Sequence, residues 1–255
     1  MQCLKCQIVK RIICVSALLV LAATHAQLSI SQTPVMETNF VSAAMTLIRQ
    51  HKFAEAQAVL LPAVEKGEAE SQALLGQIYN AGWGVPVDYE QAFKWWSRAA
   101  AGGSADGQWG LGLLYDDGKG VARDSQKAAT LWKTAAEKGN IKATVNLAFL
   151  YQEGRGVERD PKECARLFKI AAKAGEPAAQ LNYGLKVFHG EGVEQNKVLG
   201  CAWIAVAVES PRIKGSSYAK KISEQKDKAW GELSTENREK AEQLKKEIQL
   251  CIEGN

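Results

Sequence analysis

The chain has 255 residues, with 32 lysines and arginines against 28 acidic residues and a formal net charge of +4. Its first 26 residues carry three of the bases and no acid, so residues 27–255 hold 29 bases against 28 acids. A nearly neutral chain with scattered charges of both signs excludes the electrostatic footprint typical of proteins that bind nucleic acid or anionic lipid.

The N-terminus has the pattern of a secretory signal peptide. Lys5, Lys10 and Arg11 precede an apolar run over residues 12–23, and small residues follow up to Ala26, after which we expect cleavage. The alternative is a membrane anchor, but about a dozen apolar residues fall short of the ~20 that span a bilayer. No cysteine stands directly after the apolar run, as it would in a lipoprotein. The leader therefore predicts an exported protein that contacts a membrane only before cleavage.

The next ordered segment, residues 37–68, is predicted to be a helical hairpin. Residues 39–50 and 53–66 have apolar side chains at helical spacing and flank a tight turn. A shift of 36 residues places Ala63 on Ala99. The hairpin is thus a degenerate first copy of the repeat that follows it.

A 36-residue period organises residues 69–212. The recurring positions are Tyr79, Tyr115 and Tyr151; Gly82, Gly118, Gly154 and Gly190; Gly84, Gly120, Gly156 and Gly192; Asp88, Asp124, Asp160 and Asn196; and Trp96, Trp132, Phe168 and Ile204. A period held over four copies marks a repeat array.

Each copy contains two segments of helical periodicity, helix A and helix B, separated by a turn that contains glycine. In the first copy, helix A is predicted over residues 69–81 and helix B over residues 89–101. Gly82 ends helix A because glycine adopts a positive φ without a Cβ clash, and Asp88 caps the free N–H groups of helix B. The predicted fold is all-α, a right-handed superhelical solenoid of antiparallel helix pairs.

These residues resemble the Sel-one-like repeat family, a branch of the tetratricopeptide superhelices with a longer loop in each repeat. The pattern is Leu-Gly-x-x-Tyr-x-x-Gly-x-Gly-Val-x-x-Asp, then Ala, an aromatic residue, Ala-Ala and Gly, and it covers residues 69–211. The fourth copy departs from it at Val187, Asn196 and Gly200, as the end of a stack commonly does. The resemblance implies a protein-binding solenoid in the periplasm or exterior of a Gram-negative bacterium.

After Pro211 the period stops. Residues 216–232 and 235–252 read as two helices, with Ser234 as an N-cap, and they are expected to cover the apolar flank of the fourth repeat. The predicted organisation is a signal peptide (1–26), a flexible lead-in (27–36), a tetratricopeptide-like hairpin (37–68), four repeats (69–104, 105–140, 141–176 and 177–212) and C-terminal capping helices (213–255).

Resemblance to tetratricopeptide proteins also implies that the A helices line the concave side of the stack. Three rows of side chains would then face the groove: Ala73, Trp109, Val145 and Leu181; Gln77, Leu113, Phe149 and Leu185; and Asn80, Asp116, Gln152 and Phe188. Two rows are largely apolar from the second repeat onward, which suits a peptide or a partner helix. The predicted partner-binding residues are Trp109, Leu113, Asp116, Val145, Phe149, Gln152, Leu181, Leu185 and Phe188. The alternative for the aromatic residues is simple packing against adjacent helices.

Little in the sequence points to catalysis, and we predict no catalytic residue, cofactor or metal. His51 and His189, the two histidines beyond the leader, belong to distant units, which disfavours a shared metal site. Some relatives are described as β-lactam-binding, and S-x-x-K strings begin at Ser217 and Ser223, but the companion motifs S-D-N and K-T-G are missing. The Gly-x-Gly turns follow no predicted strand and are therefore not phosphate-binding loops.

Three cysteines lie beyond the leader: Cys164, Cys201 and Cys251. Cys164 and Cys201 are on B helices of adjacent repeats. Packed helices lie about 8–10 Å apart, whereas a disulfide needs Cα atoms within ~7 Å, so we expect buried thiols and no bridge.

The leading hypothesis is a non-catalytic envelope scaffold that binds a protein or peptide in the A-helix groove. Two alternatives stay open, namely a β-lactam-binding or weakly hydrolytic secreted protein and a self-associating structural solenoid.

Overall fold

The computed structural model describes residues 39–213 and 217–254, and this part of the chain forms twelve helices and no strand. The predicted signal peptide and lead-in lie outside the described residues. In chain order the helices are α2 (Phe40–Arg49), α3 (Phe53–Glu65), α4 (Ala69–Ala81), α5 (Tyr89–Ala101), α6 (Ala105–Asp117), α7 (Ser125–Glu137), α8 (Ile141–Glu153), α9 (Pro161–Lys173), α10 (Pro177–His189), α11 (Lys197–Glu209), α12 (Ser217–Gly231) and α13 (Thr235–Glu253).

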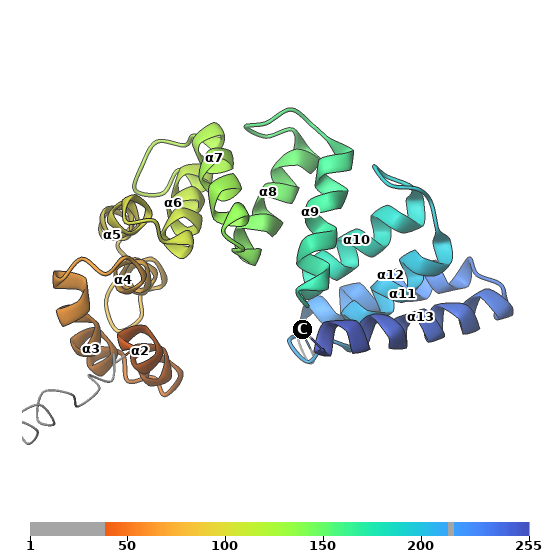
Figure 1. Cartoon of the computed structure of the whole chain (residues 1–255), viewed down its shortest axis with the longest axis horizontal. Coiled ribbons are helices and arrows are strands. Elements are labelled where there is room, and N and C mark those ends of the chain that lie inside the picture. The colour runs from red at the N-terminus through yellow and green to blue at the C-terminus, as the bar shows by residue number, and fades with distance from the viewer. Residues whose placement is uncertain (1–38, 214–216, 255) are drawn as a thin grey trace, which may run out of the picture.

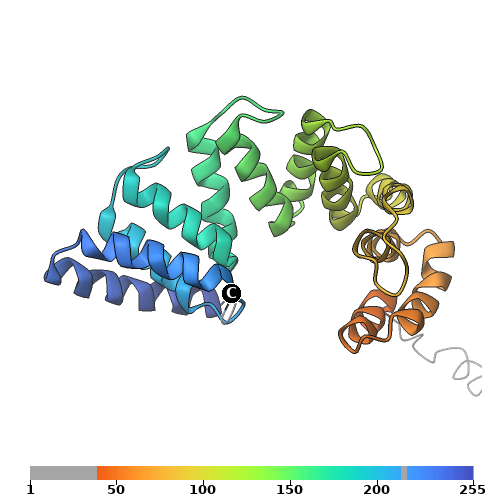
Figure 2. The ribbon, with the colours of Figure 1, turned by 180° about the vertical axis from the view of Figure 1, so that it is seen from behind.

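The helices pair into hairpins that pile up side by side into an open arch (Figure 1; Figure 2 shows it from behind). Helices α2 and α3 form the leading hairpin, and α4 to α11 form four further hairpins of equal helix length. Each B helix contacts both its own A helix and the A helix of the next hairpin. The predicted all-α solenoid of stacked helix pairs is therefore confirmed, and no single central core is needed.

The turn between helices A and B is held by local hydrogen bonds. Gly82 ends α4 in the left-handed region, at φ +69°, with its N–H bonded to the Ile78 carbonyl. The Asp88 carboxylate then accepts from the Gln91 N–H at 2.9 Å and caps α5, while the Asp88 N–H donates to the Tyr79 carbonyl at 3.0 Å. These contacts recur in all four repeats, including the fourth, where Asn196 replaces the aspartate. The end of helix A and the start of helix B are therefore fixed by the sequence nearby.

In each of the four repeats, a large buried side chain on helix B faces a small residue on helix A. Trp96 is 1% exposed, and a Cβ on Gly76 of α4 would lie 2.6 Å from its ring. Its indole N–H donates to the Ala73 carbonyl at 2.9 Å. The same pairing recurs 36 residues on with Gly112 and Trp132. In repeats three and four it becomes Ala148 with Phe168 and Gly184 with Ile204. Side-chain bulk on helix B is thus matched to space on helix A.

The second glycine of each Gly-x-Gly turn sets the spacing between neighbouring hairpins. A Cβ on Gly120, whose φ is +67°, would lie 2.6 Å from the carbonyl oxygen of Tyr89, the first residue of helix B in the preceding repeat. Gly156 and Gly192 approach Ser125 and Pro161 in the same way. The long loop of one repeat therefore rests directly on the backbone of the repeat before it, a role that the sequence pattern alone did not reveal.

The two C-terminal helices close the far end of the stack. Both α12 and α13 pack against α11. Ile222 and Ala229 of α12 and Ala241 of α13 are buried in one cluster with Phe188 and Ile204 of the fourth repeat. These contacts cover the apolar flank of that repeat, as expected. Gly200, one of the departures from the repeat pattern, lies against the backbone of Gly184 and Phe188 and leaves the hairpin regular.

Candidate functional site

In the N-terminal half of the arch, successive A helices approach one another more closely than successive B helices do. Helix α4 contacts α2 and α6 directly, whereas no two successive B helices of the described chain are in comparable contact. In a curved stack, equivalent elements approach most closely on the inner radius, so these contacts identify the concave face of the N-terminal half. Figure 1 shows the arch that encloses this face.

The first predicted row differs in exposure along the stack. Ala73 and Leu181 are buried, at 3% and 5% exposure. Trp109 and Val145 are half-buried. The Nζ atom of Lys142 lies 4.5 Å from the centre of the Trp109 ring, in cation–π contact. The backbone carbonyl of Trp109 accepts the indole N–H of Trp132 at 3.0 Å, and the Trp109 side chain packs against the same buried cluster as Trp132.

In the second row, Gln77, Leu113, Phe149 and Leu185 are all half-buried. Phe149 packs edge-to-face on the buried Phe168, with 5.2 Å between ring centres. One side of the Phe149 ring therefore packs in the core, while the rest of the ring is exposed to solvent. Phe149 thus packs against an adjacent helix and still leaves part of its ring open to a partner.

The third row contains a side chain that is structural. Asp116 is 7% exposed, and its carboxylate accepts from the guanidinium of Arg155 at 2.6 Å and from the hydroxyl of Ser125 at 3.0 Å. Arg155 also contacts Glu153 at 3.0 Å. Burial opposes the charge on Arg155, but the two carboxylates raise the pKa of its guanidinium above its ordinary value. Asp116 thus holds the loop of repeat three onto repeat two.

The C-terminal cap covers the predicted groove residues of repeat four. Leu181 and Phe188 are 5% and 2% exposed and share a cluster with Ile222 of α12, and Leu185 packs against the same cluster. These three side chains are therefore engaged within the chain. The residues that remain accessible lie on α6 and α8 and form what we call the A face: Trp109, Leu113, Val145, Phe149 and Gln152.

The histidines and serines considered as catalytic candidates lie in separate parts of the described chain. His51 lies in the turn between α2 and α3, and His189 ends α10 near the other end of the arch. Ser223 is half-buried on α12, and the neighbouring Lys226 lies over the Trp230 ring, 5.8 Å from its centre. The side chain of Ser217 lies outside the described residues. No group of three potential metal ligands occurs in the described part of the chain.

Cys164 and Cys201 are buried free thiols, as expected for their helix positions. Burial raises the pKa of Cys164, and it raises the pKa of Cys201 to about 12. Both therefore stay protonated and unreactive near neutral pH. Cys251, on α13, is exposed.

Antiparallel helix hairpins of constant helix length, stacked side by side, define a helical-repeat solenoid. The sequence profile of the Sel1 repeat matches residues 69–104, 105–140, 141–176 and 177–209, more than half of the chain. The chain therefore belongs to the Sel1 repeat family. Proteins of this family are generally interaction scaffolds and are generally non-catalytic.

Solved bacterial structures share the fold. The chain is similar to c5321, a protective antigen of uropathogenic Escherichia coli with an SLR fold, at 27% identity and a TM-score of 0.68. The match covers 77% of this chain but 41% of that one, so the present chain spans less than half of the antigen's length.

Two further structures are similar in fold. A Sel1 repeat protein from Oxalobacter formigenes is 24% identical, with a TM-score of 0.60 and coverage of 74% of this chain and 85% of that chain. A putative Sel1 repeat protein from Klebsiella pneumoniae subsp. pneumoniae is 23% identical, with a TM-score of 0.51 and coverage of 74% and 91%. No curated protein matches the chain at a significant level.

Proposed function

We propose that this chain is an exported, non-catalytic adaptor that binds a protein or peptide on the A face of repeats two and three. The observation that carries this proposal is the difference between repeats. Leu181 and Phe188 of repeat four are buried beneath the chain's own α12, whereas the A-face residues on α6 and α8 stay half-buried. An apolar surface that the rest of the chain leaves open is the part of a solenoid that is free to take a partner.

The chemistry of the A face suits an amphipathic helix or an extended peptide with apolar side chains. The side chains of Trp109 and Phe149 pack against the core on one side, so little side-chain entropy is lost when a partner covers the other side. Lys142 at the tryptophan ring and Gln152 at the end of α8 supply polar contacts at the rim. The face thus combines apolar anchors with a polar edge, the arrangement that recurs at protein interfaces.

Export rests on the leader pattern of residues 1–26, and we place the mature chain in the periplasm or exterior of a Gram-negative bacterium. Among the described helices, none is both long enough and apolar enough to cross a bilayer.

The double variant Leu113→Lys with Val145→Lys tests the A face. Each lysine keeps an aliphatic stem over the core and places its charge at the surface, so the fold should survive while an apolar partner is repelled. After crosslinking in the native envelope, the variant should recover at least tenfold less of the proteins captured by the wild type, as measured by quantitative mass spectrometry.

The matched control is Leu61→Lys with Thr130→Lys, which adds the same charge at exposed positions on B helices. It should capture the same proteins as the wild type. Circular dichroism and thermal unfolding check that both variants are folded. If the A-face variant is folded and retains full capture, the A face is not the binding surface.

A further inference from the structure

Helix α9 carries a line of cations on its exposed face. Lys162, Arg166, Lys169 and Lys173 follow one another at spacings of four, three and four residues, which places them on one face, and all four are exposed. The equivalent positions on α7 are Gln126, Thr130, Lys133 and Glu137, and those on α11 are Val198, Ala202, Ala205 and Glu209. The cation line is therefore a property of repeat three and not of the repeat pattern.

The chain leaves most of this charge uncompensated. Arg166 pairs with Glu163 at 2.6 Å. Within the described residues, Lys162, Lys169 and Lys173 have no carboxylate within 4.0 Å. Like charges one turn apart on a helix repel one another and destabilise it. A negatively charged partner would remove this repulsion.

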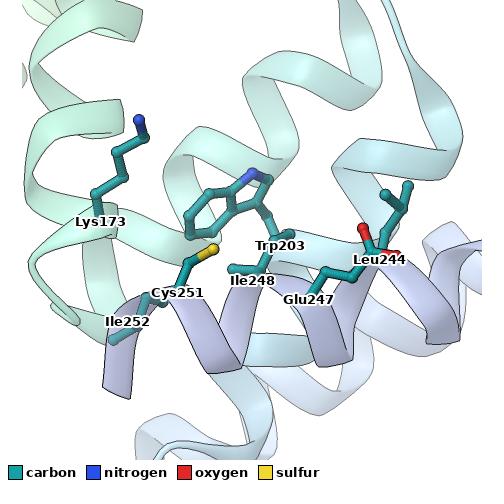
Figure 3. Close-up of a pocket in the computed structure, with 7 residues that line it drawn as sticks. All are labelled: Lys173, Trp203, Leu244, Glu247, Ile248, Cys251 and Ile252. Carbon is teal, nitrogen blue, oxygen red and sulfur yellow. The ribbon is translucent and has the colours of Figure 1, made fainter. Parts of the chain in front are cut away.

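The line ends at an apolar pocket between three helices. Lys173 forms its rim on α9, Trp203 its floor on α11, and Leu244, Ile248 and Ile252 its wall on α13, with a volume of about 330 Å³. Figure 3 shows Lys173 and Glu247 on opposite sides of the Trp203 ring. The volume is at the lower end of the range for ligand pockets, which suits a large side chain or two smaller ones.

We propose that the α9 cation line and this pocket together bind an acidic peptide segment that carries one large apolar side chain. Acidic residues would lie along Lys162, Arg166 and Lys169, and the apolar side chain would enter the pocket beside Lys173. The line runs from Lys162 to Lys173, eleven helical steps or about 16 Å, which an extended peptide covers with about five residues. This surface belongs to a B helix, so it is distinct from the A face and leaves that face open to another partner.

A peptide fits these observations better than a membrane surface. A helix that lies on a bilayer presents a broad apolar face, whereas the apolar face of α9 is buried in the stack. Ile170 is the large apolar side chain of α9 that is exposed, at 42%. A short line of positive charge that leads to a recessed apolar pocket matches a peptide in which acidic residues are followed by one large apolar residue.

Fluorescence anisotropy of a labelled, amidated peptide of four glutamates followed by phenylalanine tests the proposal on the full chain. Lys169→Glu with Lys173→Glu should weaken binding by about tenfold or more, because each exposed ion pair contributes a fraction of a kcal/mol and reversal makes it repulsive. The matched control, Lys220→Glu with Lys221→Glu on α12, makes the same change in net charge at exposed positions and should stay within twofold. Circular dichroism verifies that both variants fold.

Two further arms distinguish a peptide with an apolar anchor from a purely acidic ligand and from a lipid surface. Replacing the phenylalanine of the peptide by serine should weaken binding severalfold, because the pocket is then left empty. Vesicles that contain phosphatidylglycerol should not bind in a way that depends on Lys169 and Lys173. The proposal would be overturned if both lysine pairs weakened binding equally or if the two peptides bound with equal affinity. It would also be overturned if vesicles bound and this binding were lost in the Lys169→Glu, Lys173→Glu variant.

Discussion

The Gly156→Ala variant is expected to lose about 3 kcal/mol or more of unfolding free energy, through two separate costs. Gly156 has a φ of +71°, where an L side chain costs roughly 1–2 kcal/mol. The added Cβ would also overlap the Ser125 carbonyl group and lie 2.8 Å from the backbone nitrogen of Gln126. Because these are backbone atoms, no rotamer change relieves the overlap, and the loop of repeat three must move off repeat two.

Gly139→Ala is the matched control for this prediction. Gly139 has a φ of +86°, but nothing lies within 4 Å of an added Cβ. This variant should lose only the conformational cost of roughly 1–2 kcal/mol. Urea unfolding followed by circular dichroism compares the two variants. Equal stabilities would mean that the loop contact between repeats contributes nothing to the stack.

The second large effect concerns the match between small and large residues within a hairpin. Alanine has a higher helix propensity than glycine by about 1 kcal/mol, so Gly112→Ala in α6 would stabilise an exposed helix. Here the new Cβ would meet the Trp132 ring, 2.7 Å from Cδ1. The ring is held by its hydrogen bond to Trp109, so we expect a net loss of about 1–3 kcal/mol.

A rescue experiment shows whether the lost stability comes from this overlap. Repeat three places Ala148 opposite Phe168 at the equivalent positions. Adding Trp132→Phe to Gly112→Ala should therefore recover part of the lost stability, and the two changes should be non-additive in a double-mutant cycle. Gly231→Ala on α12, where an added Cβ meets nothing within 4 Å, should be neutral or slightly stabilising. Strict additivity of the Gly112 and Trp132 substitutions would contradict the pairing.

The helices could be predicted closely because their boundaries are local. α4 and α5 cover residues 69–81 and 89–101, as the sequence pattern predicts, and the left-handed Gly82 and the capping Asp88 explain both ends. In the leading hairpin and the C-terminal helices, the observed first or last residue of a helix differs from the predicted one by at most one position. Signals of this kind act within a few residues, so a single sequence contains them.

The candidate site could be predicted only in part, because burial depends on residues far along the chain. Asp116 has the spacing of a groove residue, yet Arg155, 39 positions later, pairs with it. Phe188 has the same spacing and is covered by α12, which lies outside the repeat. Net charge also gave no indication of the cation line on α9, because a nearly neutral total conceals charges that gather on one helix.

Site-specific photocrosslinking in cells tests the central claim, that partners bind on the inner side of the stack. A photoreactive phenylalanine analogue in place of Gln152 on the A face should form a covalent adduct with a partner protein after irradiation. The same group in place of Leu61, which is 49% exposed on a B helix, should form none. Adducts from position 61 with none from position 152, in protein that is folded by circular dichroism, would contradict the account.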